Sequence, residues 1–218
     1  MSVPLDVKVS HQGLRLERVV GGRRETELMR FRHQIFREAL RWVPESVDGL
    51  DRDEYDRYSH NYAVTRQGRV VGSVRLTPGG SPFMIEREFK RLLPEGVLIE
   101  NGVGSAEITR FAVETDKRGR RLEAATRLLY FCLYQWSRLN DVHRMYFVVE
   151  PRFFSHIRQL GFPAFPIGKA RPLDGGVMSQ AAFLDWHQAG GVFIRWLRSV
   201  PEDPVASPEQ WRASGYSR

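Results

Sequence analysis

The stretch from Ser105 to Leu160 limits the possible folds of this chain more than any other. Residues 105–113 have the apolar composition of a strand, and residues 145–149 form a short, nearly all-apolar strand of the kind that is buried on both faces. Between them lies one apolar stripe at helical spacing: Leu122, Ala125, Leu129, Cys132, Leu133 and Trp136, closed by Asn140. A helix over residues 152–160 ends before a glycine. This order predicts an α/β fold, with a mixed central sheet and helices on both faces.

The remaining segments fit the same single domain. We predict an amphipathic helix over residues 25–40 and two strands, 61–65 and 69–76, joined by a turn at Gln67-Gly68. A long ordered loop is expected over residues 45–58. The patterns further predict a short helix over 84–93, a strand over 175–183 and a final helix over 184–197. We expect the domain to cover residues 1–200 and a polar, proline-containing tail to cover 201–218.

Composition excludes several classes of protein. The formal charge of +7 and pI near 9.9 indicate acidic partners without saying which, so nucleic acid, anionic lipid, coenzyme A phosphates and acidic carrier proteins stay open. A single cysteine, Cys132, permits neither a disulfide nor a CxxC metal site, and the histidines lack metal-ligand spacing. No apolar run has the length of a membrane span or the character of a signal peptide, so we expect a cytoplasmic protein without membrane insertion.

Two features of the N-terminal half can bind a charged ligand. Arg32 and Phe36 are one helical turn apart and share a face, and Trp42 follows in the loop. The acidic run Asp51-Arg52-Asp53-Glu54-Tyr55-Asp56 could hold a cation such as an ammonium or a sulfonium. The alternatives are a core phenylalanine beside a solvated arginine, and a solvated acidic face.

Charged residues inside two predicted strands are the best physical indication of a site. Arg75 lies between Val74 and Leu76, while Glu107 and Arg110 lie within Glu107-Ile108-Thr109-Arg110-Phe111. Buried charges need a salt bridge or a ligand, and a structural ion-pair network is the alternative to a site. Strict alternation places Glu107 and Arg110 on opposite faces, so both reach one cavity only through a bulge or at the strand end.

Taken together and in this order, four motifs resemble the acyl-homoserine lactone synthases of LuxI type. These are Arg32-x3-Phe36-x5-Trp42-Val43, the acidic loop ending Asp53-Glu54-Tyr55-Asp56, Gly72-Ser73-Val74-Arg75-Leu76, and Glu107-Ile108-Thr109-Arg110-Phe111-Ala112-Val113. Two positions depart from the family pattern: Ala39 replaces a basic residue or Gln, and Asp51 replaces a common glutamate. The resemblance implies an acyltransferase with the fold of the N-acetyltransferases (GNAT-like).

The resemblance also implies a reaction and roles for its residues. The amine of S-adenosylmethionine would attack an acyl thioester, and the carboxylate of the same molecule would then close the lactone and expel methylthioadenosine. Glu107 is the candidate general base. Arg75 and Arg110 would orient the carboxylates that bind S-adenosylmethionine. The substrate-binding residues implied are Arg32, Phe36, Trp42, Asp53 and Asp56. Neither a metal nor a resident cofactor is implied, since S-adenosylmethionine is a substrate and phosphopantetheine arrives on the acyl donor.

Two segments of the sequence indicate the acyl donor. The basic turn formed by Lys117, Arg118, Arg120 and Arg121 favours an acidic acyl carrier protein over acyl-coenzyme A, although a solvated basic turn is equally compatible with it. Met145, Phe147 and Val149 would line the acyl-chain pocket. The resemblance places Phe147 where relatives that make 3-oxo products often have a threonine, which favours an unsubstituted acyl chain.

Two other functions are alternatives to this one. An N-acetyltransferase-like N-acyltransferase, such as an N-acyl amino acid synthase, would acylate an amine without closing a lactone. A nucleic-acid-binding module is suggested by net charge alone, and its basic runs lack interleaved aromatic residues. We therefore expect a monomeric enzyme that binds S-adenosylmethionine and an acyl carrier protein or acyl-coenzyme A, and no nucleic acid.

Overall fold

A computed structural model describes residues 9–115, 121–173 and 176–202. The first half of the chain forms β1 (Val9–His11), β2 (Leu14–Val19), α1 (Gly22–His33), the π-helix η1 (Gln34–Ala39), the 3-10 helix η2 (Glu54–Tyr58), β3 (His60–Arg66), β4 (Arg69–Pro78), α2 (Met84–Arg87) and the 3-10 helix η3 (Lys90–Leu92). The second half forms β5 (Ser105–Val113), α3 (Glu123–Leu139), β6 (Arg144–Val149), α4 (Pro151–Gln159), β7 (Ala164–Pro166), β8 (Arg171–Pro172), β9 (Met178–Asp185), the 3-10 helix η5 (Trp186–Gln188) and α5 (Gly191–Arg198). The predicted α/β architecture is confirmed.

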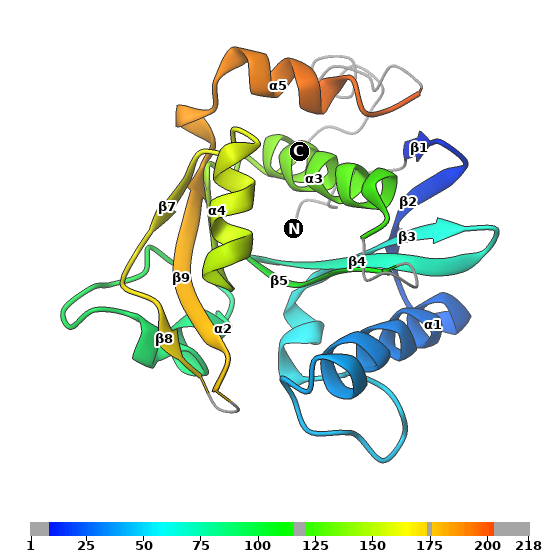
Figure 1. Ribbon diagram of the computed structural model, residues 1–218, viewed down its shortest axis with the longest axis horizontal. Helices are drawn as coiled ribbons and strands as arrows, with labels where there is room; N and C mark the ends of the chain where they lie inside the picture. The colour runs from blue at the N-terminus through cyan, green and yellow to red at the C-terminus, as the bar shows by residue number, and fades with distance from the viewer. Residues whose placement is uncertain (1–8, 116–120, 174–175, 203–218) are drawn as a thin grey trace.

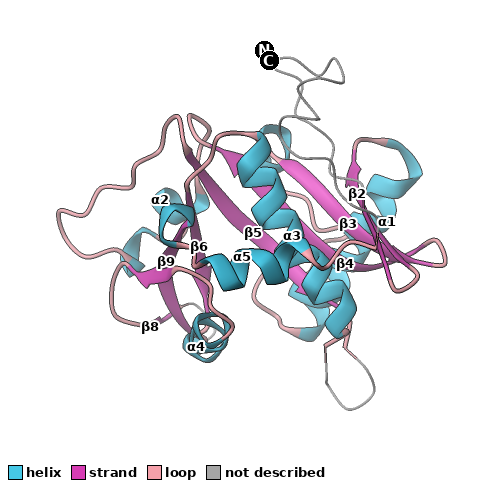
Figure 2. Ribbon diagram, turned by 90° about the horizontal axis from the view of Figure 1, so that it is seen from above, coloured by secondary structure: helices cyan, strands magenta, loops and turns pink. Residues whose placement is uncertain are grey.

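The described strands form one mixed sheet in the order β1-β2-β3-β4-β5-β6-β9-β7, with β8 also paired to β9. All of these pairs are antiparallel except β5 with β6. Helix α1 packs on one face of β4 and α3 on the other, which leaves most of β4 buried on both faces. Figure 1 shows this sandwich, and Figure 2 shows α3 lying over β4 and β5.

The parallel pair β5–β6 opens into a gap that positions the site. Pairing runs from Ser105↔Arg144 to Ile108↔Phe147 and then stops, although β5 continues to Val113. The last residues of β6, Val148 and Val149, pair only with β9. In Figure 1, β3, β4 and β5 accordingly run roughly horizontally, while β7 and β9 run roughly vertically. The two halves of the sheet therefore separate beyond Ile108 and Phe147.

Most predicted elements occur within a few residues of their expected bounds. The turn of the β3–β4 hairpin uses Gln67 and Gly68, both with positive φ (49° and 80°), as a two-residue hairpin turn requires. The predicted helix over residues 84–93 is divided between α2 and η3. Strands β1, β2, β7 and β8 were not predicted.

The predicted final helix over residues 184–197 is wrong in its first half. Leu184 and Asp185 belong to β9, where they pair with β6. The Asp185 carboxylate then accepts a hydrogen bond from the His187 N–H and begins η5, and α5 starts only at Gly191. The predicted strand over 175–183 is correspondingly shifted to Met178–Asp185. Residues 203–218 of the expected tail lie outside the described residues.

Candidate active site

An irregularity in β5 brings Glu107 and Arg110 to one cavity. The β4–β5 register shifts between Ser73 and Arg75, and Arg110 has a φ of 51°. The Ser73 hydroxyl donates to the Arg110 carbonyl oxygen at 2.8 Å, which fixes the backbone there. Positive φ is unusual for a residue with a side chain and is common at functional sites. The departure from alternation that a shared site requires is therefore present.

A buried carboxylate, Asp51, joins three arginines beneath this cavity. Its side chain is fully buried and lies 2.9 Å from Arg32 Nε, 2.8 Å from Arg37 Nε and 2.7 Å from Arg110 Nε. Burial alone would raise the pKa of this carboxyl, but Arg110 and Arg32 outweigh burial and hold the pKa well below its usual range. Asp51 is thus ionised and acts as the centre of an ion-pair network.

Arg75 extends the same network to the acidic loop. Its Nη1 lies 2.5 Å from Asp53 and 3.2 Å from Asp56, and its Nε donates to the Thr109 hydroxyl at 2.8 Å. Asp53 also meets Arg110 at 3.0 Å. Its carboxylate accepts the Tyr55 N–H, while Asp56 accepts the Asp53 N–H, so the two form a capping box that begins η2. The acidic run is therefore ordered by arginines and by its own backbone.

Two carboxyls of the site have pKa values shifted in opposite directions. Glu107 is 1% exposed, and burial raises its pKa to about 7, although the Met84 and Ile85 N–H groups that donate to it at 2.8 and 2.7 Å oppose the rise. The Asp56 pKa is lowered to about 2, because Arg32 and Arg75 outweigh the effect of burial. Glu107 can consequently exchange a proton near neutral pH, whereas Asp56 stays charged.

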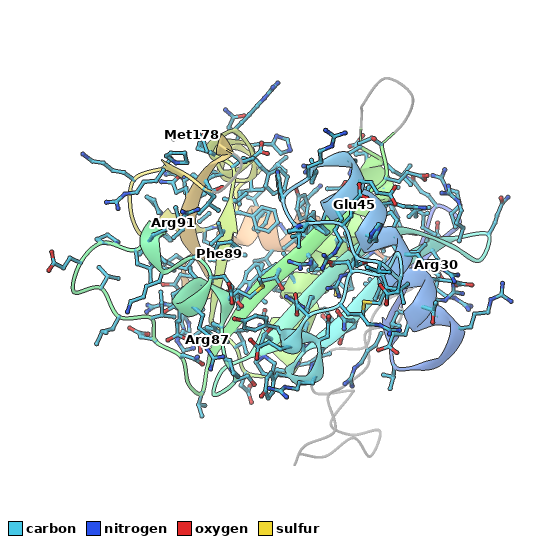
Figure 3. The ribbon with its side chains drawn as sticks, turned by 90° about the horizontal axis from the view of Figure 1, so that it is seen from below. Arg30, Glu45, Arg87, Phe89, Arg91 and Met178 are labelled. Atoms are coloured by element: carbon cyan, nitrogen blue, oxygen red, sulfur yellow. The ribbon has the colours of Figure 1, made fainter. Side chains whose placement is uncertain are left out.

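A cavity of about 630 Å³ lies over this network, and we call it the carboxylate cavity. Five acidic side chains line it: Asp53, Glu54, Glu88, Glu107 and Glu150. The rings of Phe36 and Trp42, 6.1 Å apart, form part of its wall. Figure 3 shows the molecule from below, with Phe89 and Met178 on the left and Glu45 on the right.

A second cavity of about 310 Å³ is lined mainly by apolar side chains, seven of them aromatic, and we call it the aromatic cavity. Its rings are Phe36, Trp42, Phe111, Tyr130, Phe147, Phe153 and Phe162. The two cavities share Ile108, Thr109 and Arg110 from β5 and Val148 and Val149 from β6. They therefore meet in the gap where the two strands separate.

The predicted site residues fall into four groups. Those that line a cavity are Phe36, Trp42, Asp53, Glu107, Arg110, Arg121, Phe147 and Val149. Arg32, Asp56 and Arg75 lie beneath the carboxylate cavity and do not line it. Met145 lines neither cavity because it is fully buried in the core. Lys117, Arg118 and Arg120 lie outside the described residues.

Sequence reasoning missed Asp51 and Arg37 as site residues. Asp51 was grouped with a charge run, although its position two residues before Asp53 allowed both to face the same way. Arg37 comes five residues after Arg32, and residues at this spacing lie on different sides of an α-helix. The π-helix η1 widens the turn here, and π segments often occur at functional sites.

No group of three or more metal-binding side chains occurs within residues 9–115, 121–173 and 176–202. Across the same ranges, every helix is too short or too polar to span a bilayer.

Comparisons with known proteins agree with this architecture. The family model for autoinducer synthases matches residues 21–190. An acyl-homoserine-lactone synthase of Agrobacterium fabrum is 32% identical over 149 residues, which are 66% of this chain and 70% of that protein. The solved CoA-dependent acyl-homoserine lactone synthase BjaI, with SAM and isopentyl-CoA, is 22% identical with a TM-score of 0.69, over 87% of this chain and 90% of that one. A putative N-acetyltransferase from Lactobacillus plantarum is 10% identical with a TM-score of 0.56, over 80% and 99%.

A mixed sheet that opens between the parallel strands β5 and β6 places the chain in the class of proteins with the N-acetyltransferase-like fold. Within that class, the chain belongs to the autoinducer synthase family, and its activity is that of an acyl-homoserine-lactone synthase.

Proposed function

We propose that this enzyme joins the amine of S-adenosylmethionine to an acyl group from a thioester and closes the product to an acyl-homoserine lactone. The observation that carries the proposal is the meeting of the carboxylate and aromatic cavities between β5 and β6. A charged head and an apolar tail can enter from the two sides and react where the cavities join. The BjaI structure, which contains SAM and isopentyl-CoA, has the same fold.

In this proposal the carboxylate cavity holds S-adenosylmethionine. Asp53 keeps part of its carboxylate exposed and suits the ammonium or the sulfonium, while Phe36 and Trp42 pack against the ligand. Arg32 was expected to meet the substrate carboxylate, but its guanidinium already bonds Asp51, Asp56 and Asn61 and is 1% exposed. We therefore assign Arg32 a supporting role with Asp56 and Arg75, and propose Arg37, which lines the cavity, for the substrate carboxylate.

Glu107 would accept a proton from the substrate ammonium, directly or through one water. The free amine then attacks the thioester carbonyl, and the C–S bond breaks as the carrier thiolate leaves and takes up a proton. A backbone N–H near Phe111 or Ala112 would stabilise the oxyanion. In the second step a substrate carboxylate oxygen attacks the γ-carbon, the C–S⁺ bond breaks, and methylthioadenosine departs neutral. Positioning is the main requirement of this step, because a sulfonium is a good leaving group.

We favour an acyl carrier protein as donor because the sequence of residues 117–121 is strongly basic. Arg121 lines the aromatic cavity, where its guanidinium lies 4.5 Å from the centre of the Phe153 ring. Coenzyme A is the alternative carrier. Because Phe147 offers no hydroxyl to a 3-oxo group, we propose an acyl chain without substitution at C3.

The direct test incubates the purified protein with S-adenosylmethionine and matched thioesters of acyl carrier protein and coenzyme A. We expect lactone and methylthioadenosine in equal amounts, with a higher kcat/KM for the carrier-protein series, both measured by mass spectrometry. Acylation without methylthioadenosine would instead identify an N-acyltransferase that does not close a lactone. A higher kcat/KM for the coenzyme A series would reverse the assignment of the carrier alone.

A further inference from the structure

The aromatic cavity contains a hydroxyl group without a hydrogen-bond partner. Tyr130, on α3, lines this cavity and is 3% exposed. Its phenolic oxygen is shielded from solvent and has no partner in the described part of the chain. An unpaired buried hydroxyl is unfavourable, and buried polar groups in proteins are nearly always paired. A bound group that supplied the partner would remove this penalty.

Neighbouring rings hold the Tyr130 side chain in place. Phe111 stacks on it with ring centres 5.6 Å apart, and Phe162 meets it edge-on at 4.8 Å. The ring therefore has little freedom to turn its hydroxyl elsewhere. Burial also raises the pKa of Tyr130 to about 12, so the hydroxyl is protonated at neutral pH and can donate.

The position of Tyr130 indicates which part of the acyl donor it meets. The reacting carbonyl must lie where the cavities join, beside Ile108, Thr109 and Arg110. Tyr130 and Leu133 line only the aromatic cavity, from the α3 side. The hydroxyl thus faces atoms farther from the thioester than those at the junction.

We propose that Tyr130 determines acyl specificity by donating a hydrogen bond to an oxygen that the acyl group carries beyond C3. The inference rests on the proposed function and narrows the acyl donor. The acyl chain is unsubstituted at C3 but bears a hydroxyl, carbonyl or ether oxygen deeper in the aromatic cavity. A site built to pair such an oxygen discriminates against a chain that lacks it, because the donor is then left unpaired.

The test compares wild-type protein with Tyr130→Phe on thioesters of one chain length: unsubstituted, 3-oxo, and a series with a single oxygen at successive carbons beyond C3. We expect wild type to prefer one member of the series over the unsubstituted chain by about tenfold or more in kcat/KM. Tyr130→Phe should lose that preference, so that its kcat/KM values for the oxygen-bearing and unsubstituted chains become equal. Its midpoint of thermal unfolding should equal or exceed that of wild type, since no hydrogen bond is removed.

Tyr134→Phe is the matched control. Tyr134 lies one turn later on α3, packs on Trp186 and does not line the aromatic cavity, so this variant should keep the wild-type preference. If Tyr130→Phe lowers kcat/KM equally for every acyl group, the hydroxyl contacts the constant phosphopantetheine arm and the inference is overturned. Unchanged selectivity in Tyr130→Phe would also overturn it. If wild type releases no methylthioadenosine with any of the thioesters, the proposed function itself fails. If it releases methylthioadenosine but does not discriminate between the acyl chains, only the role of Tyr130 is refuted.

Discussion

Replacing Glu107 with Gln should lower kcat by about 100- to 10,000-fold, the usual contribution of general acid–base catalysis. Glu107 is the buried carboxyl of the carboxylate cavity with a pKa of about 7, so its ionised form can take a proton from the substrate ammonium near neutral pH. Gln cannot accept that proton. The measurement is the single-turnover rate of methylthioadenosine release at saturating substrate.

The pH dependence separates a catalytic role for Glu107 from a structural one. Because the base must be ionised, wild-type kcat/KM should rise with pH through about 7 and then level off. Glu107→Gln should lose that dependence. Glu86→Gln, on α2 and paired with Asn101, should keep the rate and the rise with pH, with the midpoint moved lower because the Glu86 charge raises the pKa of Glu107. If Glu107→Gln keeps a near-normal rate, Glu107 is not the base.

Replacing Asp51 with Asn should cost about 3–5 kcal/mol in the free energy of unfolding. The substitution preserves shape but leaves the buried guanidinium groups of Arg32 and Arg110 without the anion that they share. Breaking a buried ion pair by removing one partner is far more costly than losing a surface pair. Denaturation with urea, followed by circular dichroism, measures the effect.

Two further variants complete this experiment. Glu123→Gln breaks an exposed pair with Arg127 one turn along α3, and should change stability by about 0.5 kcal/mol or less. Asp51→Glu keeps the charge and should be less destabilising than Asp51→Asn. Equal stabilities for Asp51→Asn and Glu123→Gln would show that Asp51 does not hold the network together.

Local pattern was sufficient to predict much of the fold and part of the site. The apolar stripe of α3 and the two flanking strands follow directly from side-chain spacing, and the cost of burying charge marked Glu107, Arg75 and Arg110 correctly as residues that need partners. Arg75 and Arg110 pair with carboxylates of the acidic loop, and Glu107 accepts hydrogen bonds from the Met84 and Ile85 N–H groups. Arg75 and Arg32 are thus satisfied by protein carboxylates, and the sequence could not distinguish that arrangement from direct contact with a ligand.

The missed features depend on contacts between distant parts of the chain. The positive φ of Arg110 is set by pairing with β4 and by the Ser73 hydroxyl, which no local pattern records. Leu184 and Asp185 were included in the predicted final helix, yet pairing with β6 holds them in a strand. Tertiary pairing overrides local preference in both cases.

The central claim is that the carboxylate and aromatic cavities are two halves of one active site. A crystal structure of the protein with S-adenosylmethionine and a non-reactive acyl thioester analogue tests it most directly. We predict the sulfonium and amine beside Asp53 and Glu107, the acyl chain between Phe111, Tyr130 and Phe147, and the carbonyl at the junction beside Thr109 and Arg110. An acyl chain bound outside the aromatic cavity, or S-adenosylmethionine bound away from Asp53 and Glu107, would contradict the account.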